Sequence, residues 1–184
     1  MTRNEALAIL DEYIENQNLK RHMYAVEAAM IDYAHRFEED AQAWGLAGLL
    51  HDFDWEIHPT LDEHPQAGAP ILRERGVPED VIRCILSHAD HTGMPRETRM
   101  EKALYACDEL TGLIVAVCLV RPSRSLADLT VSSIRKKWGN ARFAAAVDRH
   151  EIEQGSAELG IPLWTHVANV LSSMQGIADQ IGLE

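Results

Sequence analysis

The residues of this sequence best suited to chemistry are a histidine followed directly by an aspartate, His51 and Asp52. They end the apolar, small-residue segment 44–50, which has the composition of a buried helix. Burying an imidazole and a carboxylate is costly unless each has a partner, and a metal ion is one such partner. A helix C-terminus with the carboxylate in a turn explains the pair about equally well. The dipeptide alone therefore leaves both interpretations open.

Four more residues able to bind a metal lie in or beside helical segments. His22 opens the second helical pattern, and Asp108 lies on an apolar helical face, where a lone carboxylate needs a partner. His64 precedes the fourth pattern and His88 ends the fifth. Singly, the aspartate fits a buried salt bridge and each histidine fits a cap or a surface residue. Together they give a set of imidazole and carboxylate groups in the order His22, His51, Asp52, His64, His88 and Asp108.

In this order and local context the sequence resembles the HD superfamily of metal-dependent phosphohydrolases. That family is recognised by a histidine, then a His-Asp pair, then an aspartate, placed on a bundle of helices. The residues at those positions are His22, His51, Asp52 and Asp108. His64 and His88 resemble the additional ligands of HD members that hold two metals. The resemblance covers roughly residues 20–115 and is greatest to HD-type dinucleoside polyphosphate hydrolases and cyclic-dinucleotide phosphodiesterases.

The resemblance implies one or two divalent transition metals. We expect one metal on His22, His51 and Asp108, a second on His64 and His88, and Asp52 as the catalytic bridge between them. Imidazole and carboxylate groups suit Mn, Fe, Co, Ni or Zn, and suit Mg less well. Two metals about 3.5–4 Å apart can clamp an in-line phosphoryl displacement and lower the pKa of bound water to about 7. A metal-bound hydroxide would then attack a phosphate ester or anhydride of a nucleotide-like small molecule.

Four features differ from these relatives. The cyclic-dinucleotide enzymes carry two adjacent histidines where this chain has His88-Ala89, and a Gly-Tyr-Pro signature where residues 93–95 are Gly-Met-Pro. Many HD enzymes have a lysine shortly after the His-Asp pair, whereas residues 53–56 contain none. The region after Asp108 does not match the polyphosphate hydrolases well.

Two other functions are alternatives to hydrolysis. Some HD-fold enzymes use the same six ligands to bind two irons and cleave C–C or C–P bonds with oxygen, and no residue of this sequence excludes that alternative. A non-catalytic binding domain is disfavoured, because such a domain need not keep all six ligands. We therefore expect a metal-dependent hydrolase, with an HD-type di-iron oxygenase as the alternative.

Auxiliary roles are assigned to residues near these positions. His91 lies in a Gly/Pro loop and is a candidate general acid for the leaving oxygen, although a solvated loop histidine fits somewhat better. Arg121 and Arg124, in a polar break after a long apolar helix, are candidates for binding substrate phosphate. Asp54 and Glu109 flank ligands and can orient imidazoles. The histidines expected at the surface are His35, His58, His150 and His166.

The elements that must position these residues all show helical periodicity. Asn4 is suited to cap the first helix, and Pro65 and Gly76 to bound the fourth. No segment alternates like a strand, and no repeat or linker is visible. We expect an all-α fold, an HD-type helical bundle in a single domain 1–184, with its core at about 20–120 and a C-terminal helical extension at 121–184. The expected helices span about 4–14, 20–37, 40–50, 65–76, 77–89, 97–120, 125–139 (or 128–139), 141–147, 149–159 and 163–181.

Composition limits the partners. The net charge of −12 over 184 residues argues against duplex nucleic acid, but a metal can supply the positive charge that a small phosphorylated substrate needs. The three cysteines form no C-x-x-C pair and fit reduced thiols of a cytoplasmic protein. The longest apolar run, 113–120, is shorter than the about 20 residues that span a bilayer, and no signal peptide is visible. A homodimer through the C-terminal helices stays open.

Overall fold

The computed structural model describes residues 1–184 and contains nine α-helices, one short 3-10 helix and no strand. The all-α prediction is therefore confirmed. No helix combines the length and the apolar character that crossing a membrane requires. In chain order the elements are α1 (Arg3–Tyr13), α2 (Gln17–Phe37), α3 (Ala41–Leu50), α4 (Ala69–Glu74), α5 (Glu79–Ser87), η1 (Asp90–Thr92), α6 (Arg99–Leu119), α7 (Val131–Trp138), α8 (Arg149–Glu158) and α9 (Leu163–Gln175).

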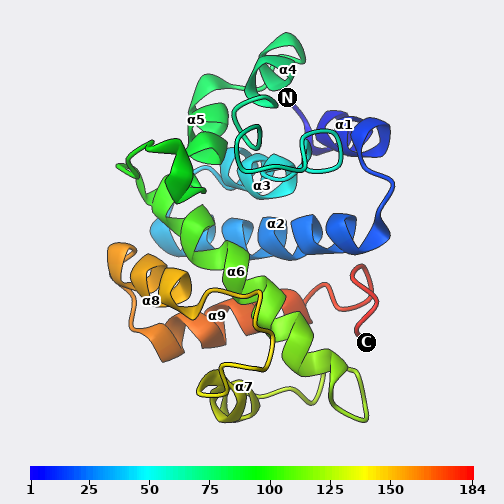
Figure 1. Cartoon of the computed structure of the whole chain (residues 1–184), viewed down its shortest axis with the longest axis vertical. Helices are drawn as coiled ribbons and strands as arrows, with labels where there is room; N and C mark the ends of the chain where they lie inside the picture. Colours follow the sequence, from blue (N-terminus) through cyan, green and yellow to red (C-terminus); the bar gives the residue numbers. More distant parts are fainter.

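The two longest helices, α2 and α6, cross near the centre of the molecule (Figure 1). Helices α1, α3, α4 and α5 lie on one side of α2, and α7, α8 and α9 lie on the other (Figure 1). Helix α2 packs against α3, α6 and α9, while α6 also packs against α5 and α8. The buried apolar side chains form one cluster of 43 residues that extends from Ala6 to Leu183. Both ends of the chain thus contribute to the core that surrounds the α2–α6 crossing.

The first helix begins earlier than its expected cap, Asn4. The hydroxyl of Thr2 accepts from the backbone N–H of Glu5, and the Glu5 carboxylate accepts from the N–H of Thr2. This reciprocal pair is a capping box, which satisfies two N–H groups that a helix start leaves free. The prediction of Asn4 as the cap is wrong because Thr2 has the glutamate three residues on that completes the box.

The fourth helix also differs from its prediction. Residues 64–68 form turns, and α4 begins only at Ala69. His64 is buried and its imidazole is bound to Asp54, so this part of the chain is held by a side-chain contact. Pro70 then stands in the first turn of α4, where its missing N–H costs no helical hydrogen bond. The segment 141–147, expected to be helical, forms turns as well.

Two glycines allow helices to approach each other closely. A Cβ on Gly48 of α3 would lie 2.9 Å from the backbone N of Glu27 in α2. A Cβ on Gly155 of α8 would lie 2.6 Å from the Cα of Ala106 in α6. No side chain fits at such distances, so glycine is required where α3 meets α2 and where α8 meets α6. These contacts bring the C-terminus of α3, and the start of α8, close to the α2–α6 crossing.

Candidate metal centre

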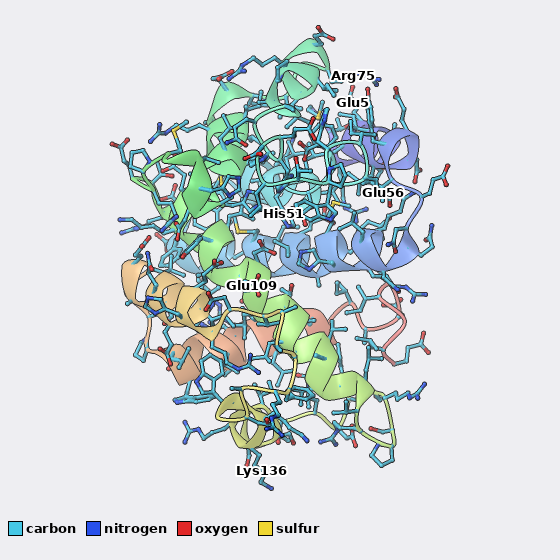
Figure 2. The ribbon with its side chains drawn as sticks, in the orientation of Figure 1. Glu5, His51, Glu56, Arg75, Glu109 and Lys136 are labelled. Carbon is cyan, nitrogen blue, oxygen red and sulfur yellow. The ribbon has the colours of Figure 1, made fainter.

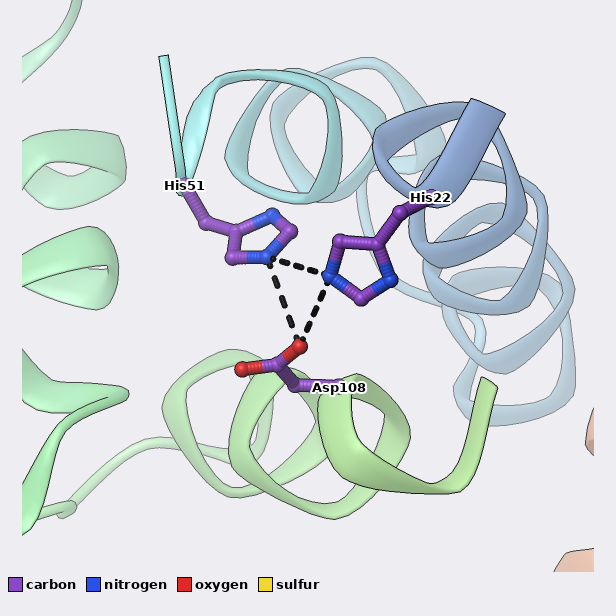
Figure 3. A group of neighbouring side chains, drawn as sticks. All are labelled: His22, His51 and Asp108. Atoms are coloured by element: carbon purple, nitrogen blue, oxygen red, sulfur yellow. Dashed lines mark hydrogen bonds and ion pairs between the residues drawn. The ribbon is translucent and has the colours of Figure 1, made fainter. Parts of the chain in front are cut away.

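One group of metal-binding side chains comes from three helices. His22 lies on α2, His51 follows the last residue of α3, and Asp108 lies in the middle of α6 (Figure 3). The Nε2 atom of His22 is 3.0 Å from Asp108 Oδ1 and 3.2 Å from His51 Nε2. His51 Nε2 is 3.5 Å from the same Asp108 oxygen. Three atoms able to bind a metal therefore form a compact triangle.

A second group joins Asp52 to two histidines. His64 lies in the turns before α4, and His88 follows the last residue of α5. The two Nε2 atoms of His64 and His88 are 3.4 Å apart, and they lie 3.3 Å and 3.7 Å from Asp52 Oδ1. Both imidazoles are buried. This group has the composition and the spacing of the first.

The carboxylate of Asp52 connects the two groups. Its Oδ1 faces His64 and His88, while its Oδ2 lies 3.8 Å from His22 Nε2 and 3.5 Å from His51 Nε2. Figure 2 labels His51 near the centre of the molecule, where α3 meets α2. The two oxygens of one side chain thus face different groups. All six residues that the sequence analysis singled out as ligands come together at this place.

The hydrogen bonds of three imidazoles fix where their protons are. Nδ1 of His51 donates to the carbonyl of Gly48 at 2.9 Å, and Nδ1 of His88 donates to the carbonyl of Ile85. Nδ1 of His64 donates to Asp54 Oδ1 at 2.7 Å. Carbonyl and carboxylate oxygens only accept, so each Nδ1 carries a proton. In the neutral imidazole, each Nε2 then presents a lone pair.

Thr111 extends the same conclusion to His22. The Thr111 hydroxyl donates its one proton to the backbone carbonyl of Asp108 at 2.9 Å. Its oxygen, 3.2 Å from Nδ1 of His22, therefore accepts from that nitrogen. The Nε2 of His22 is left as a lone pair facing the others. Thr111 was not predicted from the sequence, although its position three residues after Asp108, on the same helix face, is a usable signal.

A metal ion satisfies this arrangement in composition and in spacing. Four Nε2 lone pairs and the oxygens of Asp52 and Asp108 are all acceptors, and they converge with no donor among them. Such groups repel one another unless a cation or a proton lies between them. Metal–ligand bonds of about 2.0–2.2 Å place neighbouring ligand atoms about 2.8–3.6 Å apart. Most of the separations within the two groups, 3.0 to 3.7 Å, lie in this range.

Without a metal, protons bind at the same site because its carboxylates make the potential there negative. Burial acts to lower the pKa of His51, but Asp52 and Asp108 outweigh it and raise the pKa to about 9. Burial likewise opposes the effect of Asp52 and Asp54 on His64, whose pKa is also raised to about 9. The site therefore attracts positive charge of either kind. Metal binding would displace these protons and would strengthen as the pH rises.

Asp54 holds one of the imidazoles in place. It is fully buried, and its Oδ1 accepts from His64, whereas its Oδ2 has no hydrogen-bond partner. A Cβ on Gly68 would lie 2.5 Å from that Oδ2, so only glycine leaves room for the carboxylate. A carboxylate behind a metal-binding histidine fixes the ring and makes its Nε2 a better ligand. This arrangement supports the orienting role expected of Asp54.

The two groups open into a cavity of about 570 Å³. Trp55 and Leu61 line it from the segment after α3, Val147 lines it from the segment before α8, and Glu151 lines it from the first turn of α8. Cavities of about 300–1,000 Å³ are typical of small-molecule sites. The cavity wall from residues 146–151 was not foreseen, because no local pattern tells which distant segment covers a site.

The auxiliary residues are placed differently. His91 lines the cavity, and its Nε2 donates to the backbone carbonyl of His64 at 2.8 Å. Glu109 also lines the cavity. Arg121 and Arg124 do not, and Arg121 is paired with Asp128 at 2.7 Å. They follow the end of α6, about 20 Å from Asp108 at about 1.5 Å per helical residue, so the geometry gives them no contact with the cavity.

The expectation that His166 lies at the surface is wrong. Its side chain is fully buried, whereas His35 and His150 are exposed and His58 is half-buried. Nε2 of His166 donates to the carbonyl of Ala106 at 2.7 Å, so Nδ1 accepts from the hydroxyl of Tyr33. Both nitrogens have partners, and this allows the ring to be buried. Burial lowers the pKa of His166 to about 4.

Comparison with known protein families gives one match. The family model described as HD domain matches residues 19–116. The matched region spans more than half of the chain and contains all six residues of the two groups. Helices α7, α8 and α9, and the cavity wall at residues 146–151, lie outside it. No solved structure matches the chain.

Proposed function

Because this chain belongs to the HD domain family, whose members are generally metal-dependent phosphohydrolases, we propose that it hydrolyses a phosphate ester or anhydride of a small, nucleotide-like molecule. The observation that carries this proposal is the pair of metal-binding groups that Asp52 connects. His22, His51 and Asp108 would hold one divalent ion, and His64 and His88 would hold a second. Asp52, whose two oxygens face the two groups, would contribute to both.

The bound metals would polarise the phosphate group and acidify a water molecule at the site. The residues of the chain orient these partners. The carbonyls of Gly48 and Ile85, the hydroxyl of Thr111 and the carboxylate of Asp54 each hold one imidazole by its Nδ1, so that every Nε2 points into the site. The rings thus need no reorganisation when a substrate arrives.

His91 is the side chain best placed to protonate the leaving oxygen. Its Nε2–H is held by the carbonyl of His64, and its Nδ1 has no partner within the protein. When the ring is protonated, Nδ1–H can donate into the cavity that His91 lines. Trp55, 37% exposed and edge-on to the ring of His64, offers an aromatic face for the organic part of the substrate.

One observation favours a second candidate, a di-iron oxygenase built on the same six residues. No lysine or arginine lines the cavity, so no cationic side chain is available to stabilise a phosphoryl-transfer transition state. Residues 53–56, where many HD enzymes carry a lysine, contain the buried Asp54 instead. A donor set of four imidazoles and two carboxylates suits iron as well as it suits Mn or Co.

The two candidates are separated by metal-dependent assays on the same preparation. Apo-protein reconstituted with Mn, Co or Fe is given a panel of phosphomonoesters, phosphodiesters and nucleoside polyphosphates, and phosphate release is measured. Hydrolysis with Mn or Co under anaerobic conditions supports the phosphohydrolase. Oxygen consumption with two irons and no phosphate release from any compound would replace it with the oxygenase.

A further inference from the structure

The charge of the cavity differs from what a highly anionic substrate needs. Five carboxylates line it, and no lysine or arginine does. Asp52 and Asp108 belong to the metal groups, and Asp90 is paired with Arg96 at 2.6 Å. Glu109 and Glu151 are left, and neither forms an ion pair within the chain. The cavity therefore contains two carboxyl groups that have no cationic partner within the chain.

Glu151 is free because another residue takes its usual place. It is the third residue of α8, whose cap is Asp148, and a glutamate there ordinarily folds back to accept from the backbone N–H of the cap. In this protein that N–H donates to Glu109 Oε2 at 3.1 Å. The side chain of Glu151 makes no hydrogen bond within the protein and is directed to the cavity that it lines.

The position of Glu151 is fixed by helix packing. Gly155 lies four residues later on the same face of α8, and it is the residue that contacts the backbone of Ala106 in α6. The same face of α8 therefore lies over the part of α6 that carries Asp108 and Glu109. Figure 2 labels Glu109 on α6, beside the segment that leads into α8. Glu151 and Glu109 thus approach the cavity from two elements, one of them outside the family match.

We propose that Glu109 and Glu151 form a subsite for a cationic nitrogen, so that the substrate is a phosphate ester carrying an amine. This inference rests on the proposed function, because it assumes that the phosphate binds at the two metal groups. A protonated amine is the cationic partner that the two carboxylates lack. Its N–H groups can donate hydrogen bonds to their oxygens. The subsite narrows the substrate class from nucleotide-like polyanions to small phosphomonoesters with a positive end.

The test uses metal-loaded protein and two matched series of compounds. One series is ω-aminoalkyl phosphates with chains of two to five carbons, and the other is the ω-hydroxyalkyl phosphates of the same lengths. Binding is measured by calorimetry and hydrolysis by phosphate release. We expect at least one amine to bind about tenfold or more tightly than its hydroxyl counterpart, the scale of a charge-assisted hydrogen bond.

Two variants assign that preference to the subsite. Glu151→Gln keeps the size of the side chain and removes its charge, and the amine-to-hydroxyl ratio should fall to about one. Glu153→Gln is the matched control on the solvent side of α8, where the residue is exposed, and it should leave the ratio unchanged. Thermal unfolding of both variants checks that each is folded.

The outcomes separate this inference from the proposed function. Equal binding of the two series, no binding of either, or a preference that survives in Glu151→Gln overturns the amine subsite, whether or not phosphate is released. An amine preference that depends on Glu151, with no hydrolysis of any compound, leaves the subsite standing and removes the hydrolase.

Discussion

The protein buries imidazoles in two places, and the two are built in opposite ways. At the α2–α6 crossing, four histidines have one nitrogen held and the other presented as a lone pair to its neighbours. At the α9 contact, His166 has both nitrogens in hydrogen bonds, to Tyr33 and to Ala106. The first arrangement is incomplete without a cation, and the second is complete by itself. Burial of a histidine therefore does not indicate chemistry, whereas an unsatisfied, convergent set of nitrogens does.

The largest effect expected at the first place comes from Asp52→Ala. Removing the carboxylate that faces both groups should reduce the amount of bound metal. Turnover should fall by more than about a thousandfold, because polarisation of the substrate by the metal lowers the barrier by several kcal/mol. Metal content and steady-state rates measure this. Asp62→Ala, at an exposed position in the next loop, is the control. Full activity in Asp52→Ala would refute the assignment of this residue.

At the second place, the substitution to make is His166→Phe. It leaves the hydroxyl of Tyr33 and the carbonyl of Ala106 without their partner, so the free energy of unfolding should fall by about 2–4 kcal/mol. Urea denaturation measures it, with His35→Phe at an exposed position as control. Metal content per folded chain should stay unchanged. A loss of metal in folded His166→Phe would show that the two places are not independent.

Asp54→Asn tests the metal-binding place further, because this substitution acts on one imidazole only. Asparagine still accepts from Nδ1 of His64 but lacks the charge that makes Nε2 a strong ligand. We expect the weaker-bound of the two metals to lose about 10–100-fold in affinity, the usual effect of such a partner. A competition titration with a coloured chelator measures each binding step. Unchanged affinity at both steps would mean that Asp54 has only a packing role.

The pH dependence of stability separates the two places again. Burial lowers the pKa of His166 to about 4, below about 6.5 in the unfolded chain, so only the unfolded chain takes up a proton between these values. The stability due to neutral His166 is present above pH 6.5 and is lost as the pH falls towards 4. The difference in unfolding free energy between the wild type and His166→Phe should shrink by about 2 kcal/mol from pH 7 to pH 5. A constant difference would show that His166 takes up a proton in the fold as readily as it does in the unfolded chain.

The sequence predicts those features of the fold and the site that depend on local signals. Helical periodicity predicted most helices to within a few residues, and the resemblance to the HD superfamily predicted which six side chains come together. What it missed depends on contacts between distant segments. The ring of His166 is buried because Tyr33, far earlier in the chain, supplies its partner. Likewise, Glu151 reaches the cavity because Gly155 packs on α6, and no periodicity encodes that contact.

The same reasoning explains the errors at helix ends. The cap of α1 is Thr2 and not Asn4, and the Thr2-to-Glu5 capping box that fixes it is a local signal within the sequence. The start of α4 depends on the burial of His64 against Asp54, which only the fold reveals. Arg121 and Arg124 were expected to bind phosphate because of their residue type. The length of α6 places them away from the cavity, which residue type alone does not reveal.

Metal analysis of the protein purified without added metal tests the central claim most directly. The two groups joined by Asp52 predict two equivalents of a divalent transition metal per chain, removed by chelation and restored by reconstitution. One equivalent at saturation, or none, would contradict the two-metal centre.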